Sequence, residues 1–99
     1  TALEAMLARV PGTRLILLRP PVYRSALPLP GTPNEDYDAG CRTAYAELAA
    51  RRPLTILIDW RRDRPELHDP NQFFDRSHYR QPLAREVEAE IAAALKAMR

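Results

Sequence analysis

The apolar residues of the chain form two kinds of pattern, one at helical spacing and one in short unbroken runs. Apolar residues recur at the spacing of one helix face across residues 3–10, and Pro11 with Gly12 ends this predicted helix. The unbroken run at 15–18 is typical of a parallel strand that is covered on both faces, and the largely apolar segment 54–58 is predicted to be the second strand. The pattern therefore predicts a helix followed by two buried strands further along the chain.

A second helix is predicted between the two strands, beginning at Thr32. Thr32 suits the N-cap, Pro33 suits the first helical position, and Glu35 completes the pattern of a capping box. In such a box the Thr32 hydroxyl accepts from the amide of Glu35, while the Glu35 side chain reaches back to the amide of Thr32. Pro53 ends the helix, whose expected buried face consists of Tyr37, Cys41, Ala44, Tyr45 and Leu48.

The remaining chain is predicted to contain two irregular stretches and a last helix. Residues 20–33 hold five prolines, which favours an ordered but irregular loop. Residues 61–81 are a polar loop with one expected helical turn at 70–73, capped by Asp69. The last helix is predicted over residues 82–98, with an apolar stripe of Leu83, Val87, Ile91, Leu95 and Met98.

The order helix, strand, helix, strand, helix predicts an α/β fold in a single unit over residues 1–99. A strand, a crossover helix and a second strand give parallel neighbours with a right-handed connection. We therefore expect a three-layer, flavodoxin-like partial sheet of two parallel strands with three helices. Two strands leave both sheet edges unpaired and are too few to cover three helices. Further strands are expected from another part of a longer chain or from a second copy, as a homo-oligomer.

In open parallel sheets, ligands bind beyond the carboxyl ends of the strands. Tyr23 follows the first predicted strand, Trp60 follows the second, and Tyr79 stands near the start of the last helix. These three aromatic residues are candidates for substrate binding. The loop that carries Asp75 and His78 leads from the same edge.

Asp75 and His78 are the candidate catalytic residues, because a three-residue spacing lets a carboxylate and an imidazole meet within one turn. The carboxylate would fix the tautomer of the ring, and the other ring nitrogen would be free to deprotonate a hydroxyl. Phe73, Phe74 and Tyr79 could exclude water from the pair. On spacing alone, a capped turn with a surface histidine is the favoured interpretation, because D-x-x-H occurs often by chance.

The segment FFDRSHYRQPLAREVEAEI, residues 73–91, resembles the closing block of SGNH/GDSL-type hydrolases. It is most similar to their envelope-associated relatives, the O-acetyltransferase-like proteins of polysaccharide modification. The resemblance extends from about Leu15 onward, and only its D-x-x-H motif is specific. It implies that His78 is the general base, that Asp75 orients it, and that this chain is the C-terminal part of a larger domain. It also implies an ester or acylated glycan as substrate, no cofactor, and the bacterial cell envelope as location.

The chain departs from that family in its nucleophile. The family's Gly-Asp-Ser loop and Gly-x-Asn motif have no match here, and the only serines are Ser25 and Ser77. Ser77 lies between the two dyad positions, and Ser25 lacks the pattern of a nucleophile elbow. We therefore expect the chain alone to be inactive, with the triad serine supplied from outside it. The alternative is a non-catalytic α/β scaffold that binds a glycan or a protein.

Charge and composition argue against several other classes of function. The net charge is +2, and the arginines around residues 51–64 are interspersed with acids, which favours a solvated surface over a nucleic-acid or anion site. No apolar run approaches the roughly 20 residues that span a bilayer. No metal site is expected, because the two histidines and the acids near them match no standard pattern of metal ligands; these residues are Asp63, His68, Asp69, Asp75 and His78. Cys41 is the only cysteine, which excludes an internal disulfide and suits a small core residue.

Overall fold

The computed structural model describes residues 1–98 and has a mixed α/β fold. Two strands, β1 (Leu15–Arg19) and β2 (Thr55–Asp59), alternate with three α-helices along the chain. The helices are α1 (Ala2–Leu7), α2 (Pro33–Arg51) and α3 (Gln81–Ala97). Three short 3₁₀ turns stand in the connecting loops: η1 (Arg24–Ala26), η2 (Pro65–His68) and η3 (Pro70–Gln72).

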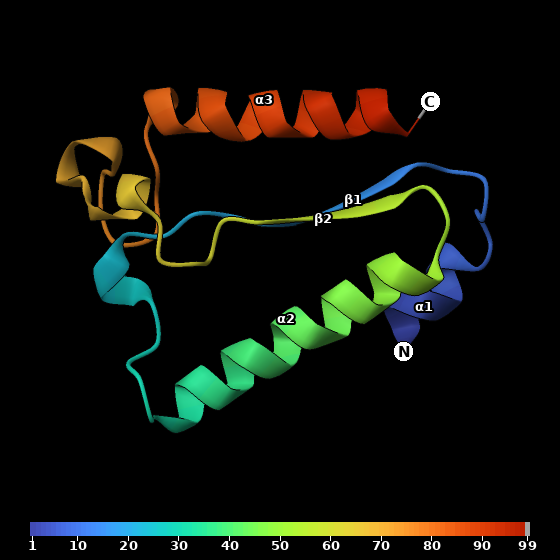
Figure 1. Ribbon diagram of the computed structural model, residues 1–99, viewed down its shortest axis with the longest axis horizontal. Helices are drawn as coiled ribbons and strands as arrows, with labels where there is room; N and C mark the ends of the chain where they lie inside the picture. The colour runs from blue at the N-terminus through green and yellow to red at the C-terminus, as the bar shows by residue number, and fades with distance from the viewer. Residues whose placement is uncertain (99) are drawn as a thin grey trace.

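The two strands pair in parallel, which confirms the predicted crossover through α2. Leu15 is paired with Thr55 at one end, and Arg19 is paired with Asp59 at the carboxyl ends of the strands. α3 and α2 lie on opposite sides of this strand pair, and α2 diverges from the strands toward its N-terminal end (Figure 1). Within residues 1–98 the sheet has no third strand, so the other edge of β1 is open.

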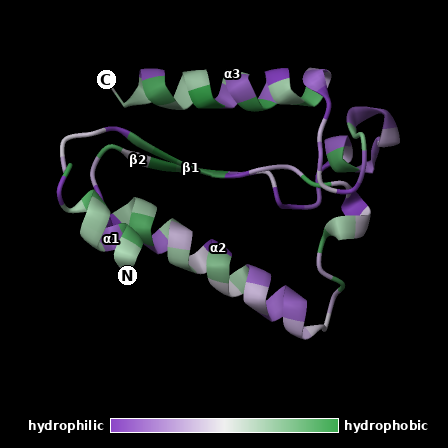
Figure 2. Cartoon of the chain, turned by 180° about the vertical axis from the view of Figure 1, so that it is seen from behind, coloured by the Kyte–Doolittle hydropathy of each residue, from purple (hydrophilic) through white to green (hydrophobic). Residues whose placement is uncertain are grey.

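The core of the protein lies between α3, the strands and the loop that joins β2 to α3. The strands are strongly hydrophobic, whereas the first half of α2 is largely polar (Figure 2). α3 begins and ends within one residue of the predicted bounds. Leu83, Val87 and Met98 of its predicted stripe are buried, whereas Ile91 and Leu95 are half-buried. The buried residues of this cluster are Ile58, Trp60, Leu67, Phe73, Leu83, Val87 and Ala94.

The prediction that one face of α2 is buried is wrong for most of the length of the helix. Only Leu48 is buried, while Tyr37 is 77% exposed and Tyr45 is 37% exposed. Cys41, expected in the core, is also exposed. Since two strands provide little surface and α2 diverges from them, only the end of the helix near β2 finds apolar partners (Figure 1).

The start of α2 follows the predicted capping box in one half and departs from it in the other. The Thr32 hydroxyl accepts from the backbone N–H of Glu35 at 3.3 Å, as expected. The Glu35 side chain instead accepts from the backbone N–H of Gly31 at 3.2 Å, because the Thr32 N–H already donates to the carbonyl of Leu29. The acid therefore closes the turn one residue further back than a standard capping box.

Two other boundaries differ from the sequence pattern. α1 ends at Leu7, its only buried residue, and leaves Val10 exposed. β2 begins one residue later than expected, since Leu54 has a φ of +54°, in the left-handed region that strands do not use. The Leu54 carbonyl accepts from the N–H of Leu15 at 2.8 Å, which fixes this turn at the entrance to the strand pair. Among the described residues, no helix is both long and apolar enough to cross a bilayer.

Candidate functional site

The segment that contains Asp75 and His78 closes on itself as a tight loop. Phe73 and Tyr79 form an antiparallel bridge, and the N–H of Phe74 donates to the carbonyl of His78 at 2.8 Å. Asp75 and His78 therefore stand at the tip of a short hairpin-like turn, just before α3. The predicted helical turn ahead of it is confirmed as η3, with the Asp69 carboxylate accepting from the N–H of Asn71 at 2.9 Å.

The Asp75 carboxylate organises this turn by accepting from backbone and side chain together. Its Oδ1 accepts from the backbone N–H groups of Ser77 at 2.9 Å and of His78 at 3.0 Å. Its two oxygens lie 2.7 and 2.8 Å from Nδ1 of the His78 ring. Because a carboxylate only accepts hydrogen bonds, Nδ1 carries the proton in this arrangement. The spacing thus brings the two candidate catalytic residues together.

The hydrogen bonds of the turn change the acidity of Asp75. The backbone N–H of Ser77 first, and then the His78 side chain, hold the pKa of the Asp75 carboxyl below its ordinary value. Asp75 therefore keeps its negative charge in mildly acidic solution. An ionised Asp75 stabilises an imidazolium when His78 accepts a proton at its other nitrogen.

Solvent reaches the pair freely within the described chain. The His78 side chain is 71% exposed and the Asp75 side chain is 59% exposed. The expected aromatic shield is not formed: Phe73 is buried in the core and Phe74 is 75% exposed on the surface. Within residues 1–98, Nε2 of His78 has no hydrogen-bond partner, and the exposure of the side chain leaves room for a proton donor to approach.

The three aromatic residues proposed for substrate binding lie in different environments. Tyr23 is half-buried and meets the Phe73 ring edge to face, with the ring centroids 5.5 Å apart. Its backbone N–H donates to the carbonyl of Arg76 at 2.8 Å, which joins the loop after β1 to the dyad turn. Tyr79 is half-buried against the core. Trp60 is 1% exposed and lies inside the core, where its ring packs against side chains and not against solvent.

The two serines occupy different positions relative to His78. The Ser77 hydroxyl lies 3.3 Å from Nδ1, the nitrogen that Asp75 already occupies, and 3.3 Å from Asp75 itself. It therefore supports the turn and does not face Nε2. Ser25 belongs to η1 and lines a cleft on the other side of Arg76.

The remaining histidine forms a separate pair. Nε2 of His68 contacts the Asp63 carboxylate, so the two histidines of the chain hold their acids through opposite ring nitrogens. The acids and histidines considered for a metal site are thus divided between two places. No group of three or more His, Cys, Asp or Glu residues in the described part of the chain could hold a metal ion.

Sequence reasoning missed an ion-pair network at the carboxyl edge of the strands. Arg19, only 6% exposed, contacts Asp38 of α2 and lies 3.3 Å from Asp59. Arg42 pairs with the same two aspartates at 2.9 and 3.2 Å, and Arg62 reaches Asp59 at 3.4 Å. This cluster fastens α2 to the ends of both strands. Its signal in the sequence was a charged residue directly at the end of each apolar run.

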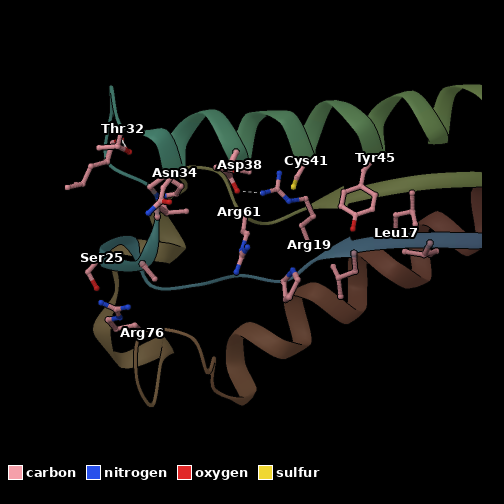
Figure 3. A pocket seen from close by; sticks show the side chains of 18 of the residues that line it. Leu17, Arg19, Ser25, Thr32, Asn34, Asp38, Cys41, Tyr45, Arg61 and Arg76 are labelled. Carbon is pink, nitrogen blue, oxygen red and sulfur yellow. Dashed lines mark hydrogen bonds and ion pairs between the residues drawn. The ribbon is translucent and has the colours of Figure 1, made fainter. Parts of the chain in front are cut away.

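A cleft of about 900 Å³ lies beside this network, between α2, β1 and the loop after β1. Its inner end is apolar, with Ile16, Leu17 and Leu18 of β1 opposite Tyr45 of α2. Its other end is polar. There Arg61 lies between Arg19 on one side and the Ser25–Arg76 wall on the other (Figure 3). Of these residues, only Arg61 belonged to the arginine cluster that the sequence pattern assigned to solvated surface. The dyad turn contributes one of these arginines to the cleft.

No protein-family model, curated protein or solved structure matches this chain. The functional interpretation therefore depends on the geometry of the dyad turn and of the neighbouring cleft.

Proposed function

We propose that this chain supplies the Asp–His part of a Ser-His-Asp triad in an acyl-ester hydrolase or O-acyltransferase of SGNH/GDSL type. In this proposal His78 is the general base, Asp75 orients it, and the substrate is an ester or an acylated glycan. The chain is then the C-terminal portion of a three-layer, flavodoxin-like domain. Its remaining strands would continue the sheet from the open edge of β1.

One observation carries the proposal: both oxygens of Asp75 lie within 2.8 Å of Nδ1, while Nε2 of His78 has no hydrogen-bond partner among residues 1–98. A catalytic triad requires this arrangement, because the acid fixes the tautomer of the histidine and the opposite ring nitrogen accepts the proton of the nucleophile. His68 has the opposite arrangement. Its Nε2 pairs with Asp63, so its other ring nitrogen is Nδ1, the one closer to the backbone of His68.

The chemistry assigned to the pair is general-base activation of a serine hydroxyl. Nε2 of His78 would take the hydroxyl proton as the serine oxygen attacks the ester carbonyl, and would return that proton to the departing alcohol. Asp75 would stabilise the imidazolium formed between these two steps. The serine would come from polypeptide outside these 99 residues, since the Ser77 hydroxyl lies against Nδ1.

A second candidate function is a non-catalytic α/β scaffold that binds a glycan or a protein. The observation that favours it is the position of Ser77, which places no hydroxyl of the dyad turn at Nε2. In this alternative, the bonds from Asp75 to the Ser77 and His78 amides serve only to shape the turn.

Hydrolysis of p-nitrophenyl acetate by the natural polypeptide that carries these residues tests the proposal. Replacing His78 with alanine should lower kcat by about 10²–10⁴-fold, the usual contribution of a positioned general base. Replacing His68 with alanine is the matched control and should leave turnover unchanged. Equal turnover in the wild type and in His78→Ala would contradict the catalytic proposal and favour the scaffold.

A further inference from the structure

We propose that the polar end of the cleft beside β1 is a binding site for a compact oxyanion, a carboxylate or a phosphate, carried by a small ligand. The guanidinium groups of Arg61 and Arg76 would bind the anion. The site is distinct from the dyad, and its existence does not depend on the proposed ester chemistry. Arg76 nevertheless belongs to the dyad turn, so an anion held there would lie next to the proposed base.

The charges that line the cleft do not balance. The lining contains three arginines and one aspartate, Asp38, so its formal net charge is +2. Asp38 is itself fully engaged, since it pairs with Arg19 and Arg42 in the network at the strand ends. No carboxylate within the described lining is therefore left to neutralise Arg61 and Arg76.

The contrast with the neighbouring arginines shows why these two are available. Arg62 and Arg64 come from the same loop as Arg61, and each has an acidic partner within 3.4 Å. The side chains of Arg61 and Arg76 have no hydrogen-bond or ion-pair partner among residues 1–98. They come from opposite ends of the connection between β2 and α3, yet both line the same cleft. Two guanidinium groups that line one cleft without a free carboxylate beside them are suited to a carboxylate or a phosphate.

Neutral groups complete the polar end of the cleft. Ser25 lies beside Arg76 (Figure 3), and Asn34 stands on the opposite wall at the start of α2. Neither side chain makes a hydrogen bond within the described chain, so both are free to donate to a ligand. The aromatic ring of Tyr37 lines the same cleft, and the volume lies in the range of small-molecule sites. A sugar acid or a sugar phosphate matches this combination of a charged clamp, polar donors and an aromatic surface.

A long polyanion fits the surroundings less well. The first turn of α2 carries Glu35 and Asp36, directly after the Asn34 wall, and these acids would repel a chain of phosphates that continued past the cleft. The positive charge is thus confined to a pocket and does not form the extended stripe typical of nucleic-acid binding.

Titration by NMR of the ¹⁵N-labelled natural polypeptide that carries these residues, with galacturonate, glucose 6-phosphate, galactose and glucose, tests the proposal. Both acids, or one of them, should give saturable shifts at Ser25, Asn34 and the backbone of Arg76, and the two neutral sugars should not. The acid that binds tighter identifies the source of the oxyanion. Added salt should weaken binding, since exposed charges are screened.

Variants assign the effect to the two arginines. Arg61→Gln and Arg76→Gln should each weaken binding of the acid about tenfold, the ratio that 1.4 kcal/mol represents for one lost charged hydrogen bond. Arg85→Gln, an exposed arginine on α3, is the matched control and should bind as the wild type does. Far-UV circular dichroism confirms that each variant folds.

Three results would overturn the proposal: no saturable shift with either acid, equal binding of the neutral sugars, or unchanged binding by a variant that lacks both Arg61 and Arg76. His78→Ala separates this proposal from the catalytic one, because it removes the proposed base and leaves the clamp intact. Anion binding should survive in that variant.

Discussion

Arg19 and Asp59 are register partners at the carboxyl ends of β1 and β2, and their side chains also pair, with Nη1 of Arg19 3.3 Å from Oδ2 of Asp59. The last register pair of the two strands and the ion pair between their side chains therefore involve the same two residues. Asp59, whose side chain is 6% exposed, also accepts from Arg42 and Arg62 and from the N–H of Arg61. One carboxylate thus holds both strand ends, α2 and the following loop.

Replacing Asp59 with asparagine should lower the free energy of unfolding by about 3 kcal/mol. A largely buried ion pair that loses one partner leaves the other charge uncompensated, which costs on the order of 3–5 kcal/mol, and Asp38 would keep part of the compensation. Urea denaturation measures the change. Asp63→Asn is the matched control: Asp63 is 75% exposed and, within residues 1–98, pairs only with His68, so its replacement should cost less than about 1 kcal/mol.

The pH dependence of the dyad turn follows from the lowered pKa of Asp75. A carboxyl whose pKa is lower in the folded chain than in the unfolded chain stabilises the fold above its unfolded pKa. That contribution is lost as the pH falls through the lowered, folded value. We expect the ¹³C carboxyl signal of Asp75 to titrate at lower pH in the folded chain than in the urea-unfolded chain.

A variant separates the causes of that lowered pKa. In His78→Ala, Asp75 should still titrate below the unfolded chain, because the strongest contribution is the backbone N–H of Ser77. The carboxyl should nevertheless titrate at higher pH than in the wild type, since the imidazole no longer donates to it. Identical titration in the folded and unfolded chains would contradict the observed hydrogen bonding of the turn.

The two neutral histidines should be opposite tautomers. His78 donates to Asp75 through Nδ1, whereas His68 donates to Asp63 through Nε2. Long-range ¹H–¹⁵N correlation spectra recorded at alkaline pH should therefore show a protonated Nδ1 in one ring and a protonated Nε2 in the other. Asp75→Asn should alter the His78 pattern and leave His68 unchanged. The same tautomer in both rings would refute this assignment.

The isolated chain should self-associate. The open edge of β1 presents unpaired backbone groups, and the neighbouring face of α2 exposes Tyr37 and Tyr45. Light scattering should give a mass that rises with concentration, and Tyr37→Lys should reduce that rise. Arg85→Lys, on the far side of the sheet, should not. A wild-type chain that stays monomeric, with a core protected from hydrogen exchange, would contradict this expectation.

Sequence patterns predicted the parts of the fold that depend on neighbouring residues. The apolar runs specified both strands and their parallel pairing, and the threonine, proline and glutamate near residue 32 specified the start of α2. The pattern failed for Tyr37 and Cys41, because helical spacing shows which residues share a face and not whether anything covers that face. Two strands do not provide enough surface to bury it.

The candidate site was also predictable only where it depends on residues that are close in the sequence. Asp75 and His78 meet because a spacing of three residues is local, and the turn that joins them is closed by its own backbone. The cleft was not predictable, because it depends on loops brought together by the sheet. Arg61 and Arg76 are separated by the whole of η2 and η3, and no periodicity relates them.

The burial of Trp60 gives the protein a built-in optical probe. Trp60 is the only tryptophan, it is 1% exposed, and the Arg64 guanidinium lies 3.5 Å from the centre of its ring. Its emission should therefore be blue-shifted while α3, β2 and the connecting loop remain packed, and should move to the red when that core opens. α2 lies on the other side of the strands, so its loss would register in circular dichroism and leave the fluorescence of Trp60 unchanged.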